Sequence, residues 1–239
     1  MVFQLSFVSI LSLSLYHNCV KKIIFFLVLA CSDHYVNAQA AFSVGTDLSL
    51  LHDFTKNQQF TAFGQTVQLN FHFTKKQSLY AWISYYTNGK YQNDLTALPK
   101  FLSTTPPSVS YTSFSRIGYR QISVGWKHYF KETFESEGPY AIYGLAGFGL
   151  LFGRAENTFN KTIDTSKYRV PQLPGSATFR RLTFDVGLGV EAPIGTGFYF
   201  YGELRTWLPA SDYPSPYLYN SDAPRVVLLN AGLRLLFDY

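Results

Sequence analysis

The chain has 239 residues, of which 47% are hydrophobic, 18% are aromatic and only 15% are charged. This length suits one large β domain or two small domains, and the aromatic share favours strands, whose pleated surfaces accommodate aromatic rings. The formal charge of +5 is modest and the basic residues are scattered, so we expect no nucleic acid as a partner.

The first 40 residues have the pattern of a secretory signal peptide. Lys21 and Lys22 precede a short apolar run, and small residues at Ala38 and Ala40 give two equally suitable cleavage sites. The run is about half as long as a spanning helix, although an inner-membrane anchor is the alternative. We therefore divide the chain into a signal peptide, 1–40, with an upstream over-extension in 1–19, and a mature domain, 41–239.

Both cysteines, Cys19 and Cys31, fall within this leader. The mature domain then holds no disulfide and no reactive thiol. Residues 28–31 resemble a lipobox, so lipidation of Cys31 is the alternative to its removal with the signal peptide.

After Ala40, apolar residues alternate with polar or small ones at period two, and no helical periodicity is sustained. We predict eight strands, with apolar positions in the ranges 42–50, 67–73, 79–85, 122–126, 142–152, 182–190, 198–204 and 227–239. The connections are alternately long and short: 51–66, 74–78, 88–115, 131–138, 155–178, 192–197 and 209–224. This pattern predicts an all-β fold, an eight-stranded antiparallel up-and-down transmembrane β-barrel with short periplasmic turns and long extracellular loops.

The polar face of these strands carries charges of both signs, whereas the apolar face carries almost none. A soluble barrel, the alternative, would turn its apolar face inward. In a membrane barrel the polar face lines the interior. With eight strands this interior is just wide enough to be filled by side chains. We therefore predict that paired charges plug the interior, and the alternative is a gated or narrow polar pore. The charged residues expected in the interior are Asp47, Lys127, Arg181, Asp185, Glu191, Glu203, Arg205 and Arg234.

The last residues alternate in the same way and end in an aromatic side chain. With this C-terminus, the mature chain resembles the OmpA-type transmembrane barrel and the small outer-membrane β-barrels often called the porin family. The resemblance implies the outer membrane of a Gram-negative bacterium, with barrel-assembly machinery and periplasmic chaperones as partners. It leaves open a role as an accessory subunit of a secretion or uptake complex. It also implies an assembly signal formed by Leu233, Leu235, Phe237 and Tyr239.

The remaining motifs argue against an enzyme. None of His52, His72 and His128 stands in a His-x-Ser arrangement, and the sequence shows no metal-ligand spacing or phosphate-binding loop. A glycine pattern over 144–149 superficially resembles a dinucleotide fingerprint, but strand alternation continues through it. We expect small residues on an inward face there, and no catalytic residue, cofactor or metal.

Two features indicate surface interaction. The expected loops carry aromatic residues, including Tyr91, Phe101 and Tyr111, which either recognise an unknown ligand or form an interface girdle. On the lipid side of three adjacent strands, just beyond the last apolar positions, lie Arg120, Arg154 and Arg180. Guanidinium groups bind phosphate in a bidentate way, so we expect these three to clamp the phosphates of lipopolysaccharide. The alternative is that they are solvated charges at the bases of loops.

Overall fold

The computed structural model describes residues 41–135, 138–210, 215–219 and 225–237. The predicted signal peptide and Tyr239 lie outside these residues. In the described part of the chain, no helix has the length and apolar character needed to cross a membrane.

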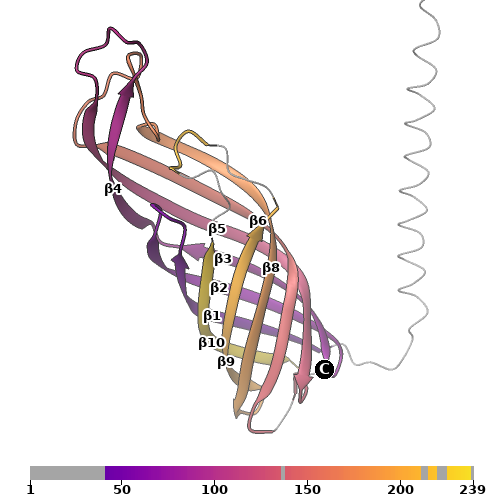
Figure 1. The fold of residues 1–239 in the computed structure, drawn as a ribbon. Helices are drawn as coiled ribbons and strands as arrows, with labels where there is room; N and C mark the ends of the chain where they lie inside the picture. Colours follow the sequence, from indigo (N-terminus) through magenta and orange to yellow (C-terminus); the bar gives the residue numbers. More distant parts are fainter. Residues whose placement is uncertain (1–40, 136–137, 211–214, 220–224, 238–239) are drawn as a thin grey trace, which may run out of the picture. The chain divides into compact units, whose positions relative to one another are not determined.

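Eight strands close into a ring, in the order β3-β2-β1-β10-β9-β8-β6-β5, with β5 pairing back to β3 (Figure 1). All neighbours in the ring are antiparallel. The predicted eight-stranded antiparallel barrel is therefore confirmed. The strands are β1 Ala41–Asp53, β2 Phe60–Thr74, β3 Gln77–Tyr86, β5 Val109–Lys131, β6 Ala141–Phe159, β8 Gly175–Gly195, β9 Phe198–Pro209 and β10 Val226–Phe237.

Much of the two segments predicted as the longest loops is strand. After Thr87 and Asn88 the chain runs on from β3 as β4 (Gly89–Pro99), which pairs with residues 109–117 of β5. The short strand β7 (Tyr168–Arg169) pairs with the end of β4. The β5–β6 and β6–β8 ladders also continue, to Phe159 and Gly175. We call this extension, formed by β4, β7 and the adjoining ends of β5, β6 and β8, the projection.

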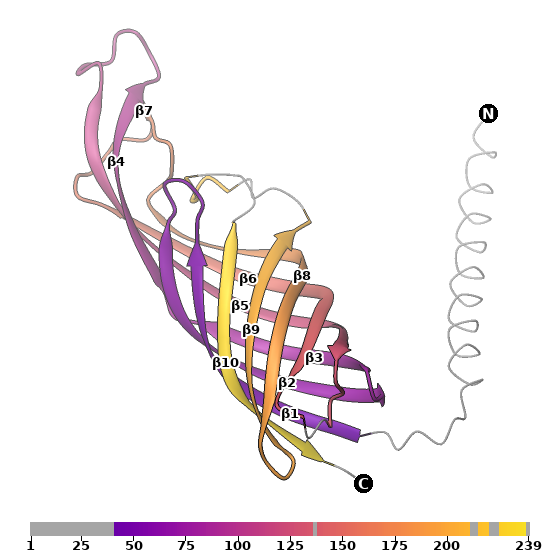
Figure 2. The same ribbon diagram turned by 60° about the horizontal axis from the view of Figure 1, so that its bottom comes forward.

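The two ends of the ring differ (Figure 1, Figure 2). At one end, here the terminal end, β1 begins at Ala41 and β10 finishes at Phe237. The turns β2–β3 and β8–β9 at this end have only two residues between the strands. The opposite, projection end carries the long strands, so the barrel wall is taller on the β3–β8 side.

Large apolar side chains point outward from every strand of the ring. One exposed example per strand, in chain order, is Leu48, Val67, Ile83, Val124, Phe148, Leu188, Leu204 and Leu229. The alternate positions are buried and mostly polar or aromatic. This distribution is the reverse of that in a water-soluble barrel and is stable only in lipid, where a closed ring satisfies every backbone group.

Two glycines allow β5 and β6 to pass beneath a buried tyrosine. Gly125 and Gly147 are direct partners across the ladder, and the hydroxyl of Tyr80 occupies the space where either glycine would carry a Cβ. Gly149 also faces inward, as expected, whereas Gly144 lies on the outer face against the ring of Phe130.

We expect Gly147→Val to destabilise the barrel, because its side chain would overlap the Tyr80 hydroxyl and the backbone oxygen of Val124. Overpacking costs about 1–3 kcal/mol, and paired strands leave little room for the backbone to move. The matched control is Gly195→Val, since no atom lies within 4 Å of a Cβ built there. The folded fraction can be measured by electrophoresis without boiling, and equal fractions for both variants would contradict this explanation.

Candidate functional site

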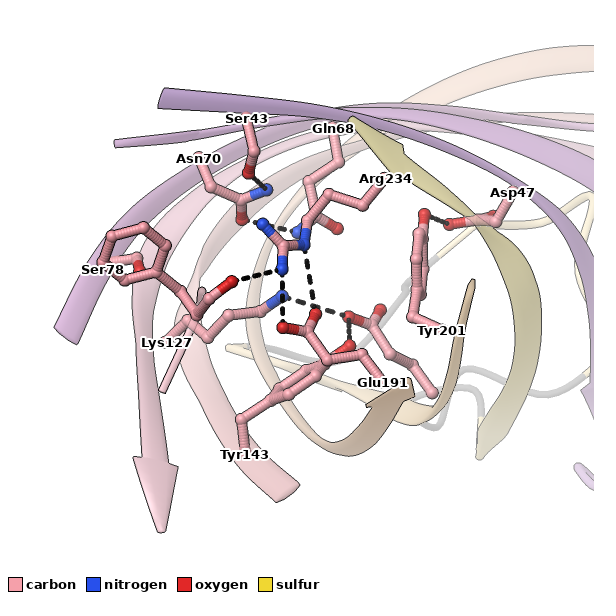
Figure 3. A network of polar contacts seen from close by, with 12 residues as sticks. Ser43, Asp47, Gln68, Asn70, Ser78, Lys127, Tyr143, Glu191, Tyr201 and Arg234 are labelled. Atoms are coloured by element: carbon pink, nitrogen blue, oxygen red, sulfur yellow. Dashed lines mark hydrogen bonds and ion pairs between the residues drawn. The ribbon is translucent and has the colours of Figure 1, made fainter. Parts of the chain in front are cut away.

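The barrel interior contains a cluster of buried charges (Figure 3). Seven of the eight charged residues predicted for the interior are buried there, and they stand on five strands. They are Asp47 on β1, Lys127 on β5, Asp185 and Glu191 on β8, Glu203 and Arg205 on β9, and Arg234 on β10. The eighth, Arg181, is partly exposed closer to the projection end of β8.

Arg234 and Glu191 form a bidentate ion pair. Arg234 donates from Nε to one carboxylate oxygen at 3.1 Å and from Nη2 to the other at 2.7 Å. Nη2 also donates to the backbone oxygen of Phe134 at 2.7 Å, and the guanidinium lies 4.1 Å from the centre of the Tyr199 ring. Two parallel hydrogen bonds fix the guanidinium in one orientation.

Glu203 stands at the centre of a second group of charges. Its carboxylate accepts a hydrogen bond from the Tyr143 hydroxyl at 2.6 Å and faces Lys127 Nζ at 3.8 Å. Arg205 donates to its other oxygen. Lys127 Nζ is also 3.8 Å from the centre of the Tyr143 ring, so the ammonium contacts both the Glu203 carboxylate and an aromatic ring.

Arg205 extends the cluster across the interior. It donates to Gln68 Oε1 at 2.9 Å and lies 3.9 Å from Asp47, whose carboxylate also accepts a hydrogen bond from Tyr201 at 2.9 Å. The guanidinium lies 4.1 Å from the centre of the Trp82 ring. This one side chain therefore connects opposite walls of the barrel, β9 with β1, β2 and β3.

Asp185 is held differently, by neutral donors. Gln121 and Thr183 donate to one of its oxygens at 2.7 and 3.1 Å, and Ser123 donates to the other. These seven residues thus comprise three buried cations and four buried carboxylates, and the carboxylate of Asp185 is stabilised by hydrogen bonds from amide and hydroxyl groups.

Apolar layers lie on both sides of these charges. At the terminal end, Phe134 from the β5–β6 connection is buried, with its ring 3.9 Å from that of His72. Toward the projection end, Tyr86, Trp207 and Leu228 form a buried cluster that Leu218, from the β9–β10 connection, joins. Leu228 breaks the sequence alternation because it belongs to this inner apolar layer.

Sequence reasoning missed several members of the interior cluster. Gln68, Trp82 and Tyr201 stand on the predicted polar faces, so alternation placed them correctly, but an uncharged residue gives no sign that it binds a charge. Phe134 lies in a turn and had no signal at all.

The structure also brings a histidine next to two serines that are distant from a His-x-Ser spacing in the sequence. His72 lies between Ser43 and Ser78, with nitrogen–oxygen distances of 2.9 and 2.6 Å. All three side chains are buried, and the Phe134 ring stacks on the imidazole. His72 therefore links Ser43 of β1 to Ser78 of β3 inside the barrel. Among the described residues, no group of three His, Cys, Asp or Glu side chains is placed to hold a metal ion.

Arg120, Arg154 and Arg180 all point outward and are exposed. Arg120 and Arg180 flank Phe152 in one row across three strands, and Arg154 lies two residues further along β6. Arg120 is 5.3 Å from the centre of the Tyr85 ring, and Arg180 is 5.8 Å from that of Phe152.

These arginines line a groove of about 590 Å³, which we call the membrane-side groove. Arg116 and Glu156, which sequence reasoning did not single out, also line it. No ion pair with a carboxylate is found for any of these four arginines in the described ranges.

The aromatic residues of the expected loops have different roles. Tyr111 is buried on β5, where it packs with Leu95 and Tyr168. Tyr168 belongs to the segment 160–174, which covers the inner face of the projection. Burial raises the pKa of its hydroxyl to about 12, so it stays neutral at physiological pH. Tyr91 is half-buried, and only Phe101, at the tip of the projection, is 65% exposed. Two of these three aromatics therefore serve packing.

Three residues of the expected assembly signal lie on the outer face of β10. Leu233 is exposed, and Leu235 and Phe237 are partly exposed. The Phe237 ring stacks on that of Phe42 of β1, with the ring centres 4.8 Å apart.

The closed ring, the outward apolar belt and the polar interior together define the fold of the small outer-membrane β-barrel proteins. No protein-family model matches the sequence. No curated protein matches it either.

Solved structures share this fold. Neisserial surface protein A is 13% identical, with a TM-score of 0.50, and the match covers 82% of this chain and 99% of that chain. OprG from Pseudomonas aeruginosa is 9% identical, with a TM-score of 0.49 and coverage of 84% and 98%. Ail, the attachment invasion locus protein of Yersinia pestis, in complex with the heparin analogue sucrose octasulfate, is 11% identical, with a TM-score of 0.47 and coverage of 83% and 99%.

We expect strong coupling between Glu191 and Arg234. Removing one partner of a buried ion pair costs about 3–5 kcal/mol, because the other charge stays buried alone. Glu191→Leu and Arg234→Leu should each destabilise the barrel this much, and the double variant should lose less than their sum by about 0.5–3 kcal/mol. Denaturant unfolding in detergent micelles measures all three.

The control cycle uses the surface pair Lys75, which is exposed, and Glu135, which is partly exposed; their charged atoms are 3.2 Å apart. An exposed pair should couple by less than about 1 kcal/mol. If the stability losses of Glu191→Leu and Arg234→Leu are additive, the two residues do not stabilise the barrel as an ion pair.

Proposed function

We propose that the chain is an integral outer-membrane protein whose barrel is sealed and whose exposed projection serves surface interaction. The terminal end would face the periplasm and the projection the outside, because export through a signal peptide leaves both termini of an even-stranded barrel in the periplasm. The outward apolar belt supports the membrane location. On this reading the C-terminal residues are recognised by barrel-assembly machinery and periplasmic chaperones.

The observation that carries the sealed-barrel proposal is the side chain of Arg205. It contacts Glu203, Asp47 and Gln68 on three strands, with apolar layers on both sides along the barrel axis. An ion crossing this interior would have to break several buried charge contacts, and each broken contact leaves a charge without its partner. A low-conductance pore is the alternative function, and an accessory subunit of a secretion or uptake complex is another.

We expect the refolded wild type to show no stepwise current in a planar bilayer. The variant Glu203→Ala/Arg205→Ala removes the central contact and leaves Lys127 and Asp47 without their ion-pair partners. Its folded fraction is therefore checked first by electrophoresis without boiling, and we expect the folded variant to admit ions. The control Lys75→Ala/Glu135→Ala removes an equivalent pair of charges from the surface and should stay closed. Steady wild-type conductance equal to that of the interior variant would favour the pore.

We also propose that Arg120, Arg154 and Arg180 bind phosphate groups of lipopolysaccharide in the outer leaflet. Three exposed guanidinium groups directly beyond the apolar belt support this, since the next outward residues toward the membrane are Ile122, Phe152 and Leu182. The Tyr85 and Phe152 rings beside Arg120 and Arg180 restrict where these side chains lie. A planar guanidinium held in place binds phosphate through two hydrogen bonds.

Replacing Arg120, Arg154 and Arg180 with Gln should lower the unfolding temperature in lipopolysaccharide-containing membranes and leave it nearly unchanged in neutral detergent. The matched control removes three exposed charges outside the groove, by Lys56→Gln, Arg169→Gln and Arg225→Gln. Equal losses in both environments would indicate general damage to the fold, and no loss in either would remove the site.

A further inference from the structure

A second groove lies on the outer face of the projection. Its volume is about 600 Å³, and we call it the projection groove. Its outward-facing lining consists of Lys90, Gln92, Phe114, Arg116, Glu156 and Thr158. Arg116 and Glu156 also line the membrane-side groove, so the two grooves adjoin at these two residues.

The projection groove presents two adjacent cations. Lys90 and Arg116 are direct partners across the β4–β5 ladder, and like charges in that position repel each other. On its other side Arg116 is the direct partner of Glu156 across the β5–β6 ladder, so the two cations have one carboxylate residue beside them. In the part of the chain that the structure describes, neither forms an ion pair with a carboxylate. An anion bound between Lys90 and Arg116 would be attracted by both and would offset their mutual repulsion.

The distance between the two grooves limits what can occupy both. Arg116 and Arg120 are four residues apart on β5, which corresponds to about 14 Å along a strand. A phosphate group is much shorter than this distance, so we expect separate phosphates at the two positions. One ligand that contacts both must carry anionic groups on separate units of a chain.

The other residues of the projection groove suit a sugar chain. Gln92 and Thr158 offer hydrogen-bond donors and acceptors, and the exposed ring of Phe114 offers an apolar face to the C–H groups of a sugar ring. The carboxylate of Glu156 accepts hydrogen bonds from sugar hydroxyls and repels ligands with anionic groups on every unit. The groove therefore favours a glycan with isolated phosphates over a densely sulfated one.

We propose that the projection groove binds the phosphorylated inner-core sugars of the lipopolysaccharide molecule whose lipid A phosphates occupy the membrane-side groove. The inference rests on the proposed function of that lower groove and extends it to the saccharide. The protein would then hold one lipopolysaccharide molecule at two points, one at the membrane boundary and one above it.

Binding to the folded protein in detergent tests the inference with three ligands: lipid A, lipopolysaccharide with a phosphorylated inner core, and the same lipopolysaccharide without core phosphates. We expect wild type to bind the phosphorylated core at least about tenfold more tightly than the unphosphorylated one, since two cations gain a partner. Lys90→Gln removes a cation that lines the projection groove alone, so this variant should lose most of the preference and still bind lipid A like wild type.

Two further variants separate the possible failures. Arg120→Gln/Arg180→Gln should weaken binding of all three ligands, and the control Lys56→Gln/Arg169→Gln should behave like wild type. If the Lys90→Gln variant keeps the full preference for core phosphates, the inference is overturned and the membrane-side groove is unaffected. If the Arg120/Arg180 variant binds lipid A like wild type, the proposed function itself is overturned. Displacement of the phosphorylated core by a soluble sulfated oligosaccharide at lower concentration would assign the projection groove to a ligand from outside the cell.

Discussion

Pairing of the first strand with the last is the constraint on which the rest of this structure depends. β1 and β10 match twelve residue pairs, from Phe42 with Phe237 to Asp53 with Val226. In the apolar part of a membrane there is no water to satisfy an open strand edge, so a sheet of this kind exists there only when it closes. Once it is closed, each strand has one face toward lipid and one toward the interior.

Closure with eight strands leaves little space inside, and this explains the character of the interior. Large aromatic rings such as Trp82 and Tyr143 fill the width, and charged side chains bridge between strands. Buried charges are tolerable only with partners, which is why Arg205 and Glu203 have several contacts each. The Gly125–Gly147 pair reflects the same shortage of space, since Tyr80 can only lie across strands that carry no side chains there.

The unequal length of the strands produces the outer surface. β5 has 23 residues, whereas β10 has 12, so one wall continues past the ring as the projection. Its inner face is covered by the segment 160–174, which packs Ile163 and Tyr168 against Leu95. Its outer face stays open. Lys90 and Arg116 on that face lie on the same side of the wall as Arg120, which stands at the edge of the apolar belt. The two grooves therefore exist because these strands continue without a break in alternation.

The sequence by itself determined the fold class, the eight strands of the ring and the direction of most of their side chains, because a closed barrel repeats one rule at every second residue. Arg234 and Glu191 were assigned to the interior on this basis, and Arg120 to the outside. Only the tertiary structure decided which charges meet, because partners such as Glu203 and Lys127 lie on strands that are neighbours in neither sequence nor sheet. It also decided that residues 89–99 form a strand. The polar alternation in that segment is weak in sequence, and the segment becomes a strand because β5 offers a partner edge and the segment 160–174 provides an apolar cover.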